Sequence, residues 1–489
     1  MKTSYDAIVI GAGFGGSACA GLLAKRGLDV LLVEKNARAG GKAMSISKNG
    51  YTYTAWVVIG APVMGNLYEA VANELGVSEL VDVVAPGTQG SMYRRSSGRY
   101  EPLPSMPIGQ TDPNVIFEWL EIAPADRDAA LMFFAQLTMM PPDEIAKLHD
   151  VSFDAWLRSH DIPRPLYAFL VSLCCDGMFM VPVDLLEAAE AIKSLQDMFL
   201  RHGGMFSRGG FGRVAEAYCE AVRRHGGTVL MKTKTDRILV EDGMVKGVVT
   251  SAGTFTAPIV ISNAGLQPTV LKLVGEAHFS REYVDKIKSL VPSWALLGHR
   301  YFLSRKVIDV PYGVVFSSDS PWSLERLEKA GRGEASREGV VYFEVPSNYD
   351  PNAAPAGKQV VITGSFCPPS PHMTAEEISA WAKAGETYFF KAFPELPSAI
   401  EDDEIYTPRD VSNLTRESVL HGVGGETIGL GQIVGQCGPG KPPVQAPVRG
   451  LFIVGCDAGA SGVGTQQAIE SGMNVADAVM EYRRSMKAA

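Results

Sequence analysis

The chain has little that would tie it to nucleic acid or to a strongly anionic surface. Its 489 residues carry a formal net charge of -9, and no basic run is present, which disfavours both kinds of partner. The sequence also has no apolar run of roughly 18 residues and no secretory leader. We therefore expect a cytoplasmic protein without a membrane-spanning helix.

Metal-binding and disulfide patterns are missing as well. The seven cysteines are scattered without a CxxC pair, and the eight histidines show no HxxxH spacing. This pattern predicts reduced intracellular thiols and no metal site. What remains is an ordinary globular composition, 46% hydrophobic and 20% charged, on a chain long enough for two or more domains.

The most informative segment follows an apolar strand that ends at Ile10. It reads Gly11-Ala12-Gly13-Phe14-Gly15-Gly16 and leads into a helix predicted over 14–26. Gly11 permits a tight turn, Gly13 lets a diphosphate approach the backbone, and Gly16 allows close packing of helix on strand. The free amides and the positive dipole end of such a helix suit a diphosphate.

A second strand, predicted over 29–33, ends in Glu34. An acid at this place, about 20 residues after the glycines, accepts hydrogen bonds from ribose hydroxyls and disfavours the 2′-phosphate of NADP. The order of strand, turn, helix, strand and acid predicts a bound dinucleotide. A glycine-rich turn without a ligand is the alternative.

A matching glycine-rich segment closes the chain. A strand predicted over 451–454, which we expect to return beside the first strand, leads to Gly455, Asp457 and Gly464, and a helix is predicted over 465–483. The 25 residues after Gly464 are too few for a second nucleotide-binding unit. In between, helix 214–225 and strands 228–231, 236–240, 245–250 and 255–261 predict a third piece of the same domain.

Lys35 opens a turn that reads Lys-Asn-Ala-Arg-Ala-Gly-Gly-Lys and ends at Lys42. Here the chain resembles the FAD-dependent phytoene desaturase, carotenoid isomerase and retinol saturase-like family of the amine oxidase superfamily. The resemblance implies FAD as the cofactor. It implies that Gly40, Gly41 and Lys42 lie along the diphosphate and the ribityl chain of FAD, with Ala264 near the diphosphate and Asp457 at a ribityl hydroxyl. It also implies that Thr235 and Asp236 lie near the adenine, and that Gly464 and Thr465 lie at the pyrimidine edge of the flavin ring.

The resemblance also implies an α/β fold. We expect a Rossmann-like FAD-binding domain of the glutathione-reductase type, assembled from residues 1–75, 201–270 and 426–489. A mixed α+β substrate-binding domain, from residues 76–200 and 271–425, is inserted between these pieces. In the insert we expect helices within 117–120, 129–140, 166–180, 185–200 and 374–393, and strands at 294–302, 313–316, 339–345 and 359–366.

One segment departs from the family pattern. Where members carry Gly-Phe-x-Phe-Asp-x-Gly-Pro, this chain reads Gly50-Tyr51-Thr52-Tyr53-Thr54-Ala55-Trp56-Val57. By analogy Trp56 lies close to the flavin, which shifts the expected substrate from a long carotenoid toward a shorter terpenoid or an alicyclic molecule. Methionines at 132, 139, 140, 178, 180, 198 and 205 suit either a pocket for an apolar ligand or ordinary core filling.

The sequence therefore predicts an FAD oxidoreductase that desaturates, saturates or isomerises carbon–carbon bonds of a hydrophobic substrate by hydride transfer at flavin N5. A flavin amine oxidase and a non-catalytic flavin-bound partner subunit are the alternatives. The electron acceptor is open among oxygen, a quinone or another redox partner, and 165–180 is the candidate for peripheral membrane contact. Asp176, His299 and Tyr301 are weak acid–base candidates, so no catalytic side chain is assigned.

Overall fold

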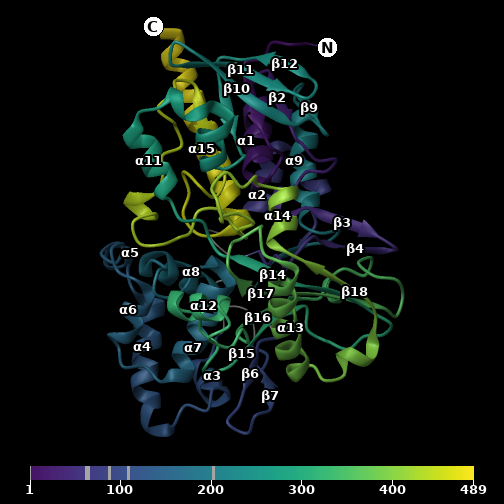
Figure 1. The fold of residues 1–489 in the computed structure, drawn as a ribbon, viewed down its shortest axis with the longest axis vertical. Coiled ribbons are helices and arrows are strands. Elements are labelled where there is room, and N and C mark those ends of the chain that lie inside the picture. Colours follow the sequence, from purple (N-terminus) through teal and green to yellow (C-terminus); the bar gives the residue numbers. More distant parts are fainter. Residues whose placement is uncertain (1, 61–65, 86–89, 107–110, 201–203, 489) are drawn as a thin grey trace.

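One half of the molecule is built on a parallel five-stranded sheet. The computed structural model describes residues 2–60, 66–85, 90–106, 111–200 and 204–488. The sheet lies in the upper half of Figure 1, where both chain ends also lie. Its strands, in spatial order, are β19 (Leu451–Ile453), β13 (Val260–Ser262), β1 (Ala7–Ile10), β2 (Val30–Val33) and β9 (Thr228–Leu230).

This half has three layers because each buried strand presents apolar side chains on both faces. Ala7 and Val9 of β1 face a helical layer, whereas Ile8 and Ile10 face a small antiparallel sheet. The helical layer consists of α1 (Phe14–Lys25), α2 (Leu67–Leu75), α9 (Gly212–Arg224) and α15 (Gly464–Ala488). The antiparallel sheet consists of β10 (Thr235–Glu241), β11 (Met244–Thr250) and β12 (Gly253–Thr256).

Two strand predictions in this half were wrong in detail. The single strand expected over 255–261 is two strands, because Pro258 lacks the N–H that would continue a ladder and the chain passes there from one sheet to the other. The closing strand β19 pairs with β13 instead of β1. The reason is that β1 is already paired on both sides, by β13 and by β2.

The other half is built on a seven-stranded mixed sheet, seen in the lower half of Figure 1. One face is covered by helix α13 (Ala375–Ala392), whose Tyr388 and Phe389 pack on Tyr301 and Phe343. The strands, in spatial order, are β18 (Ile400–Tyr406), β14 (Ala295–Leu303), β17 (Gln359–Cys367), β16 (Val341–Glu344), β15 (Tyr312–Phe316), β6 (Met92–Arg94) and β7 (Tyr100–Pro102). The strands β6, β7 and β18 were not predicted.

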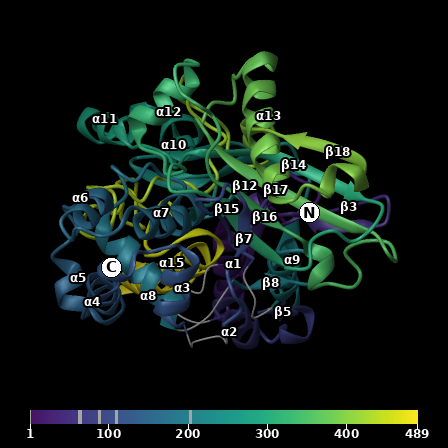
Figure 2. The same ribbon diagram turned by 90° about the horizontal axis from the view of Figure 1, so that it is seen from below.

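Helices cover the opposite face of this sheet, on the left of Figure 2. The apolar segment 166–180 is buried among them, and it ends in a π-helical turn (Cys174–Phe179) after α7. The Ser152 side chain caps α6, where it accepts a hydrogen bond from the Ala155 N–H. These helices are α3 (Pro113–Trp119), α4 (Arg127–Met139), α5 (Pro142–Ala146), α6 (Phe153–Arg158), α7 (Arg164–Leu173) and α8 (Ala188–Leu200).

The remaining elements connect the two halves or lie at their edges. A hairpin of β3 (Ser45–Lys48) and β4 (Tyr51–Thr54) and a short pair, β5 (Val83–Val84) with β8 (Phe206–Ser207), complete the strands. The other helices are α10 (Leu266–Pro268), α11 (Arg281–Ser289), α12 (Leu324–Gly331) and α14 (Pro408–Leu414). The predicted fold class, a Rossmann-like α/β unit with an inserted mixed α+β part, is confirmed.

Candidate functional site

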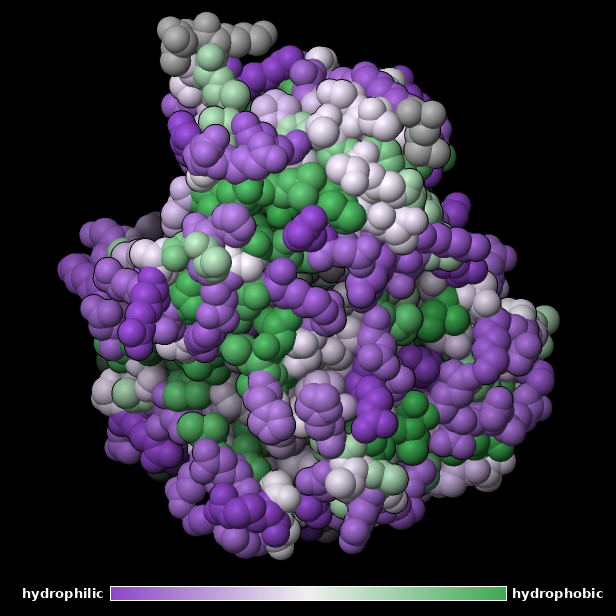
Figure 3. Space-filling view, turned by 45° about the horizontal axis from the view of Figure 1, so that its top comes forward, coloured by the Kyte–Doolittle hydropathy of each residue, from purple (hydrophilic) through white to green (hydrophobic). Residues whose placement is uncertain are grey.

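A cavity of about 830 Å³ lies at the carboxyl ends of the parallel strands and extends into the second half. Strands β1 and β2 reach it through Ile10 and Val33, and the chain beyond β13 and β19 reaches it through Asn263 and Val454. This edge is where open α/β sheets bind their ligands. Figure 3 shows apolar surface gathered near the junction of the two halves, bordered by hydrophilic residues.

Most residues predicted to touch the cofactor line this cavity. From the first segment these are Gly11, Gly13, Phe14, Gly15, Glu34, Lys35, Gly40, Gly41, Lys42 and Trp56; from the later segments they are Thr235, Ala264, Asp457, Gly464 and Thr465. Ala12, Gly16 and Asp236 are not among the lining residues. Asp236 is exposed, and it is the neighbouring Thr233 and Lys234 that reach the cavity beside Thr235.

The glycines of the first turn are required by close backbone packing. A Cβ on Gly13 would lie 2.6 Å from the Oδ1 of Asn263, and a Cβ on Gly41 would lie 3.2 Å from the Cα of Gly13. A Cβ on Gly16 would lie 2.0 Å from the carbonyl oxygen of Gly11. Gly16 therefore acts as predicted in helix–strand packing, although it does not itself line the cavity.

Glu34 is held in place at the end of β2. Its carboxylate accepts hydrogen bonds from the backbone N–H groups of Ala12 and Asn36, both at 2.8 Å. Burial raises the pKa of Glu34, and these two backbone hydrogen bonds oppose the increase. Ala12 thus contributes through Glu34, whose remaining acceptor positions are available for ribose hydroxyls.

The charge of the cavity suits a diphosphate. Its described lining residues include six basic side chains, from Lys35, Lys42, Lys234, Lys272, Arg409 and Arg416, against three acidic ones, from Glu34, Glu417 and Asp457. A dinucleotide diphosphate brings negative charge into such a place, and the excess of cations compensates it. The residues present therefore fit a flavin dinucleotide.

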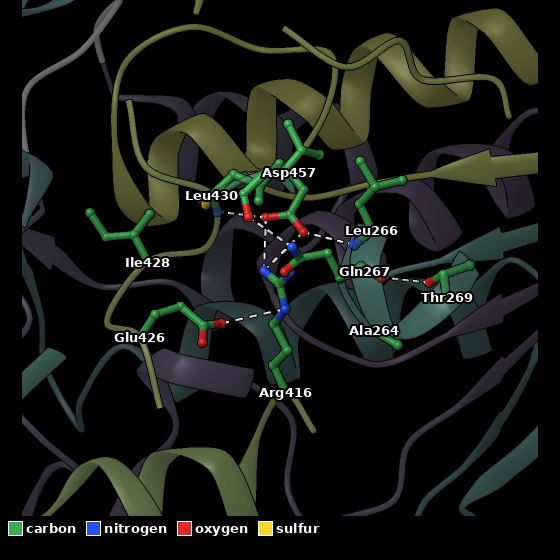
Figure 4. Close-up of polar contacts among 12 residues, drawn as sticks. Ala264, Leu266, Gln267, Thr269, Arg416, Glu426, Ile428, Leu430 and Asp457 are labelled. Atoms are coloured by element: carbon green, nitrogen blue, oxygen red, sulfur yellow. Dashed lines mark hydrogen bonds and ion pairs between the residues drawn. The ribbon is translucent and has the colours of Figure 1, made fainter. Parts of the chain in front are cut away.

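Four buried or partly buried charges meet at the cavity, whose wall contains three of them, Lys42, Arg416 and Asp457. The Lys42 ammonium lies 2.8 Å from Glu426, and the Arg416 guanidinium lies 2.9 Å from Asp457 and 3.4 Å from Glu426. Figure 4 shows Arg416 between the two carboxylates, with the backbone N–H groups of Leu266 and Leu430 also directed at Asp457.

These contacts determine the protonation state of Asp457. Burial acts to raise its pKa, but Arg416 and the two backbone hydrogen bonds outweigh burial and hold the pKa of Asp457 below its usual range. For Arg416, burial acts to lower the pKa, and the carboxylates of Asp457 and Glu426 outweigh it and raise the pKa. Both side chains are ionised at neutral pH.

Arg416 and Glu426 were missed by the sequence analysis. Both lie in the segment between α14 and β19, which has little regular structure; Arg416 falls inside the predicted insert of 271–425, and Glu426 is the first residue after it. Arg416 contacts an acid 41 residues away, and Glu426 contacts Lys42 across 384 residues. No local pattern reports contacts of that range, so the sequence offered no signal for them.

The part of the cavity beyond Trp56 is apolar, and we call it the apolar arm. Among the described lining residues, it contains Val57, Val58, Ile59, Leu173, Met178, Met180, Met198, Val314, Tyr342 and Val463. None of these carries a charge. Of the seven methionines noted in the sequence, Met178, Met180 and Met198 thus line the cavity, whereas Met132 and Met139 are exposed and Met205 packs in the core of the first half.

The weak acid–base candidates do not reach this arm. Asp176 is fully buried in the π-helical turn, and burial raises its pKa well above the usual range, but it is not a lining residue. His299 and Tyr301 stack on each other on β14, with ring centroids 5.0 Å apart, and neither lines the cavity. The Trp56 indole donates to the Lys42 carbonyl and packs near Tyr406.

The start of α15 forms part of the cavity wall, and the helix packs on the first turn, where a Cβ on Gly15 would lie 2.8 Å from the Ala468 carbonyl oxygen. Gly464 begins the helix with φ +63°, and it lines the cavity together with Thr465. The Thr465 hydroxyl forms a 2.6 Å hydrogen bond with the Tyr68 hydroxyl. The preceding loop is held by α8, because the Gly462 N–H donates to Glu190 at 2.9 Å.

Two further properties bear on the kind of site. Within the ranges that the structure describes, no three His, Cys, Asp or Glu side chains come together as a metal site would need. Over the same residues, no helix has both the length and the apolar composition to cross a bilayer.

Comparisons with known proteins agree with this geometry. Human all-trans-retinol 13,14-reductase is 23% identical over 516 residues, covering 94% of this chain and 83% of the relative. The phytoene desaturase of Cercospora nicotianae is 25% identical and covers 73% and 60%; the chloroplastic prolycopene isomerase of Arabidopsis thaliana is 24% identical and covers 83% and 72%.

A solved structure shows the same fold over nearly the whole chain. An oxidoreductase from Methanosarcina mazei superposes with a TM-score of 0.71 at 19% identity, covering 97% of this chain and all of the other. The sequence also matches the family described as flavin containing amine oxidoreductase over residues 14–480. The chain belongs to this family, and it is an FAD-dependent oxidoreductase.

Proposed function

We propose that this oxidoreductase acts on carbon–carbon bonds of a neutral, hydrophobic substrate of the isoprenoid, terpenoid or alicyclic class. The observation that carries the proposal is the apolar arm, which continues directly from the cofactor cradle. Its described lining residues, from Val57 to Val463, carry no charge, and three of them are methionines with adaptable thioether side chains.

Bound FAD would supply a two-electron hydride acceptor or donor at its N5 position. The apolar arm would hold the substrate carbon against the ring and exclude water from it. The start of α15, at Gly464 and Thr465, would stabilise negative charge on the pyrimidine edge through its backbone N–H groups and its dipole. No described side chain of the arm is a strong acid or base, which favours hydride transfer without a paired general base.

The type of reaction stays open among desaturation, saturation and isomerisation. The names of the relatives include a reductase, a desaturase and an isomerase of isoprenoid molecules. Trp56 lies where the arm begins, and the same cavity also has to contain the cofactor. These two facts support a shorter terpenoid or an alicyclic molecule over a long carotenoid.

The amine oxidase alternative has less support. A cationic amine needs a carboxylate or an aromatic cage near the ring. Trp56, Tyr312 and Tyr342 put aromatic rings in the cavity wall, but the acidic lining residues Glu34, Glu417 and Asp457 belong to the cofactor side, so the arm offers an amine no carboxylate. A non-catalytic flavin carrier would not need an apolar arm that opens onto the cofactor.

The test is anaerobic mixing of the FAD-loaded protein with terpenes, carotenoids, cyclic ketones and amines. We expect flavin bleaching with a terpenoid or an alicyclic alkene or ketone, and a product identified by mass. Met198→Trp should slow bleaching by roughly tenfold by filling the arm. Met132→Trp, at an exposed site, should leave the rate unchanged.

Bleaching by amines alone would replace the proposal with an amine oxidase. A flavin that no compound of the panel bleaches, and that Met198→Trp leaves unaffected, would favour the carrier. The acceptor of the electrons, whether oxygen, a quinone or another redox partner, follows from which of these reoxidises the bleached protein.

We also propose that the outer face of α4 rests on a lipid surface. The segment 165–180, predicted for this contact, is buried. The two most exposed large apolar side chains of the described residues lie instead on α4, where Met132 is 75% and Met139 is 79% exposed, and Leu200, where α8 ends, is 53% exposed. The exposed residues of α4 from Ala129 onward carry no charge, and Met198 of α8 lines the cavity.

Lipid fits this face better than a second copy of the chain. The helix has 13 residues and is about 20 Å long, so its outer face is smaller than a stable dimer needs. A hydrophobic substrate also partitions into lipid.

The test is flotation of the FAD-loaded protein with neutral lipid vesicles. Replacing both Met132 and Met139 by Glu should abolish flotation, whereas Ile405→Glu on β18 should not. Dimerisation lost in the same double variant would overturn the proposal, as would absence of flotation.

A further inference from the structure

The hydrogen bonds of Asp457 leave it little capacity for a cofactor. Its Oδ1 accepts from the Leu430 N–H at 2.9 Å and from Arg416 Nη1 at 3.0 Å. Its Oδ2 accepts from the Leu266 N–H at 2.7 Å and lies 2.9 Å from the same Nη1. A carboxylate offers about four acceptor positions, and here three accept hydrogen bonds from the protein while the Arg416 ion pair lies against the fourth. A ribityl hydroxyl would have to displace one of these donors.

Arg416, in contrast, has donor capacity to spare. Its Nη1 is committed to Asp457 and its Nε faces Glu426 at 3.4 Å, while Nη2 makes one long contact of 3.4 Å with Gln267. A guanidinium carries five N–H groups, two of them on Nη2. Among the residues that the structure describes, at least one Nη2 donor therefore has no acceptor at normal hydrogen-bond length.

The place of Arg416 directs this donor toward the cofactor cradle. The residue lines the cavity, and its guanidinium packs against Gly265, where a Cβ would lie 2.5 Å from Nε. Gly265 follows Ala264 and Asn263, and the Asn263 side chain packs against the diphosphate turn at Gly13. The guanidinium thus lies beside the turn that precedes α10 and lines the cavity near the diphosphate turn.

We propose that Arg416 is the polar contact to the ribityl–diphosphate part of FAD, and that Asp457 is the positioning residue that holds it there. A planar guanidinium suits phosphate and hydroxyl oxygens. In this arrangement the segment after α14, far in sequence from the glycine turns, contributes a cation to the cofactor site. Asp457 then acts through Arg416.

The test is a double-mutant cycle on FAD binding, measured by calorimetry on the apoprotein without any substrate. Arg416→Gln should weaken FAD binding by roughly tenfold or more, and Asp457→Asn should weaken it to a similar extent. In the Arg416→Gln background, Asp457→Asn should cause no further loss. Because substrate is absent, failure here is distinguishable from failure of the proposed reaction.

Two outcomes would overturn the proposal. If the fold-losses of the single variants multiply in the double variant, Asp457 contacts FAD independently of Arg416. If Arg416→Gln binds FAD as tightly as the unaltered protein, Arg416 makes no contact. The ³¹P resonances of bound FAD give a readout that a merely structural role would not move: they should shift in Arg416→Gln.

Arg300→Gln is the matched control. Arg300 is also buried and paired with a carboxylate, Glu404, at 3.2 Å, but it lies outside the cavity lining. This variant should leave the ³¹P resonances in place. If the Arg416→Gln apoprotein fails to fold because its buried carboxylates are left unpaired, Arg416→Lys takes its place in the test, since lysine keeps the positive charge. It should still bind FAD less tightly, and Asp457→Asn added to it should again cause little further loss.

Discussion

The cofactor cradle and the apolar arm differ in what forms their walls. In the cradle, the glycine turns leave no room for a methyl group, as at Gly16, where an added Cβ would lie 2.0 Å from the Gly11 carbonyl oxygen. In the substrate half, the cavity wall is made of apolar side chains on a sheet and its covering helices, such as Met198 and Val314. The cradle is therefore sensitive to any added atom, whereas the apolar arm can change its side chains and keep its fold.

The largest expected effect tests the cradle directly. Gly16→Ala should cost about 3 kcal/mol of unfolding free energy and most of the FAD affinity, because the new Cβ would lie 2.0 Å from the Gly11 carbonyl oxygen. Helix propensity alone would favour alanine in α1. Urea unfolding and calorimetric titration with FAD measure the two losses.

A glycine of the substrate half provides the control. Gly331, the last residue of α12, has no heavy atom within 4 Å of the position of an added Cβ. Gly331→Ala should be neutral or slightly stabilising and should leave FAD binding unchanged. Equal losses in the two variants would show that the contact of Gly16 with the Gly11 carbonyl oxygen is not the cause.

The second effect concerns a buried acid that supports the apolar arm. Glu344 on β16 accepts hydrogen bonds from the Tyr349 hydroxyl and from the Val58 N–H, and Val58 is a lining residue. Burial raises the pKa of Glu344 to about 7, from an ordinary value of 4.5, although both hydrogen bonds oppose this. The folded protein therefore keeps a proton that the unfolded chain releases.

The raised pKa of Glu344 makes the free energy of unfolding depend on pH. Between pH 4.5 and 7 the folded state binds one more proton at Glu344 than the unfolded state, so this group lowers stability as the pH rises through that window. The total amounts to about 3 kcal/mol. Glu344→Gln should remove that part of the decline, seen as a smaller loss of unfolding free energy from pH 5 to pH 8. An unchanged decline would show that Glu344 ionises normally.

The difference between local contacts and tertiary packing explains which features could be predicted from the sequence. The turn from Gly11 to Gly16 could be predicted because each glycine is required by a contact near it in the sequence. The place of Glu34 followed from its distance of about 20 residues from these glycines. Strand β18 was missed because its central residues, Glu401 to Glu404, are acidic and mostly exposed at the edge of the sheet, which gives no apolar signal. The strand expected over 255–261 concealed the change of sheet at Pro258.

Contacts between segments far apart in the sequence could not be predicted either. The pairing of Arg416 with Asp457, and of Lys42 with Glu426, joins loops whose sequences have no periodicity. The methionines of 178–198 were read correctly as a choice between pocket and core, but only the packing of α7 and α8 decides which of them line the cavity. Tertiary packing, which a local pattern does not encode, places the polar wall and the apolar arm.

The smallest expected effect tests whether the substrate half also contains strong local signals. Helix α13 was predicted to start at Thr374, and there the Thr374 hydroxyl accepts from the Glu377 N–H while the Glu377 carboxylate accepts from the Thr374 N–H. Thr374→Ala should cost about 1 kcal/mol of unfolding free energy, because a helix N-terminal N–H loses its acceptor. FAD affinity should not change, since α13 covers the face of the sheet away from the helices α3–α8 and none of its residues lines the cavity.

Thr254→Ala, at an exposed position of β12, is the control and should stay within about 0.5 kcal/mol of the unaltered protein. A loss of FAD affinity in Thr374→Ala would mean that the two halves are coupled more tightly than their separate cores indicate.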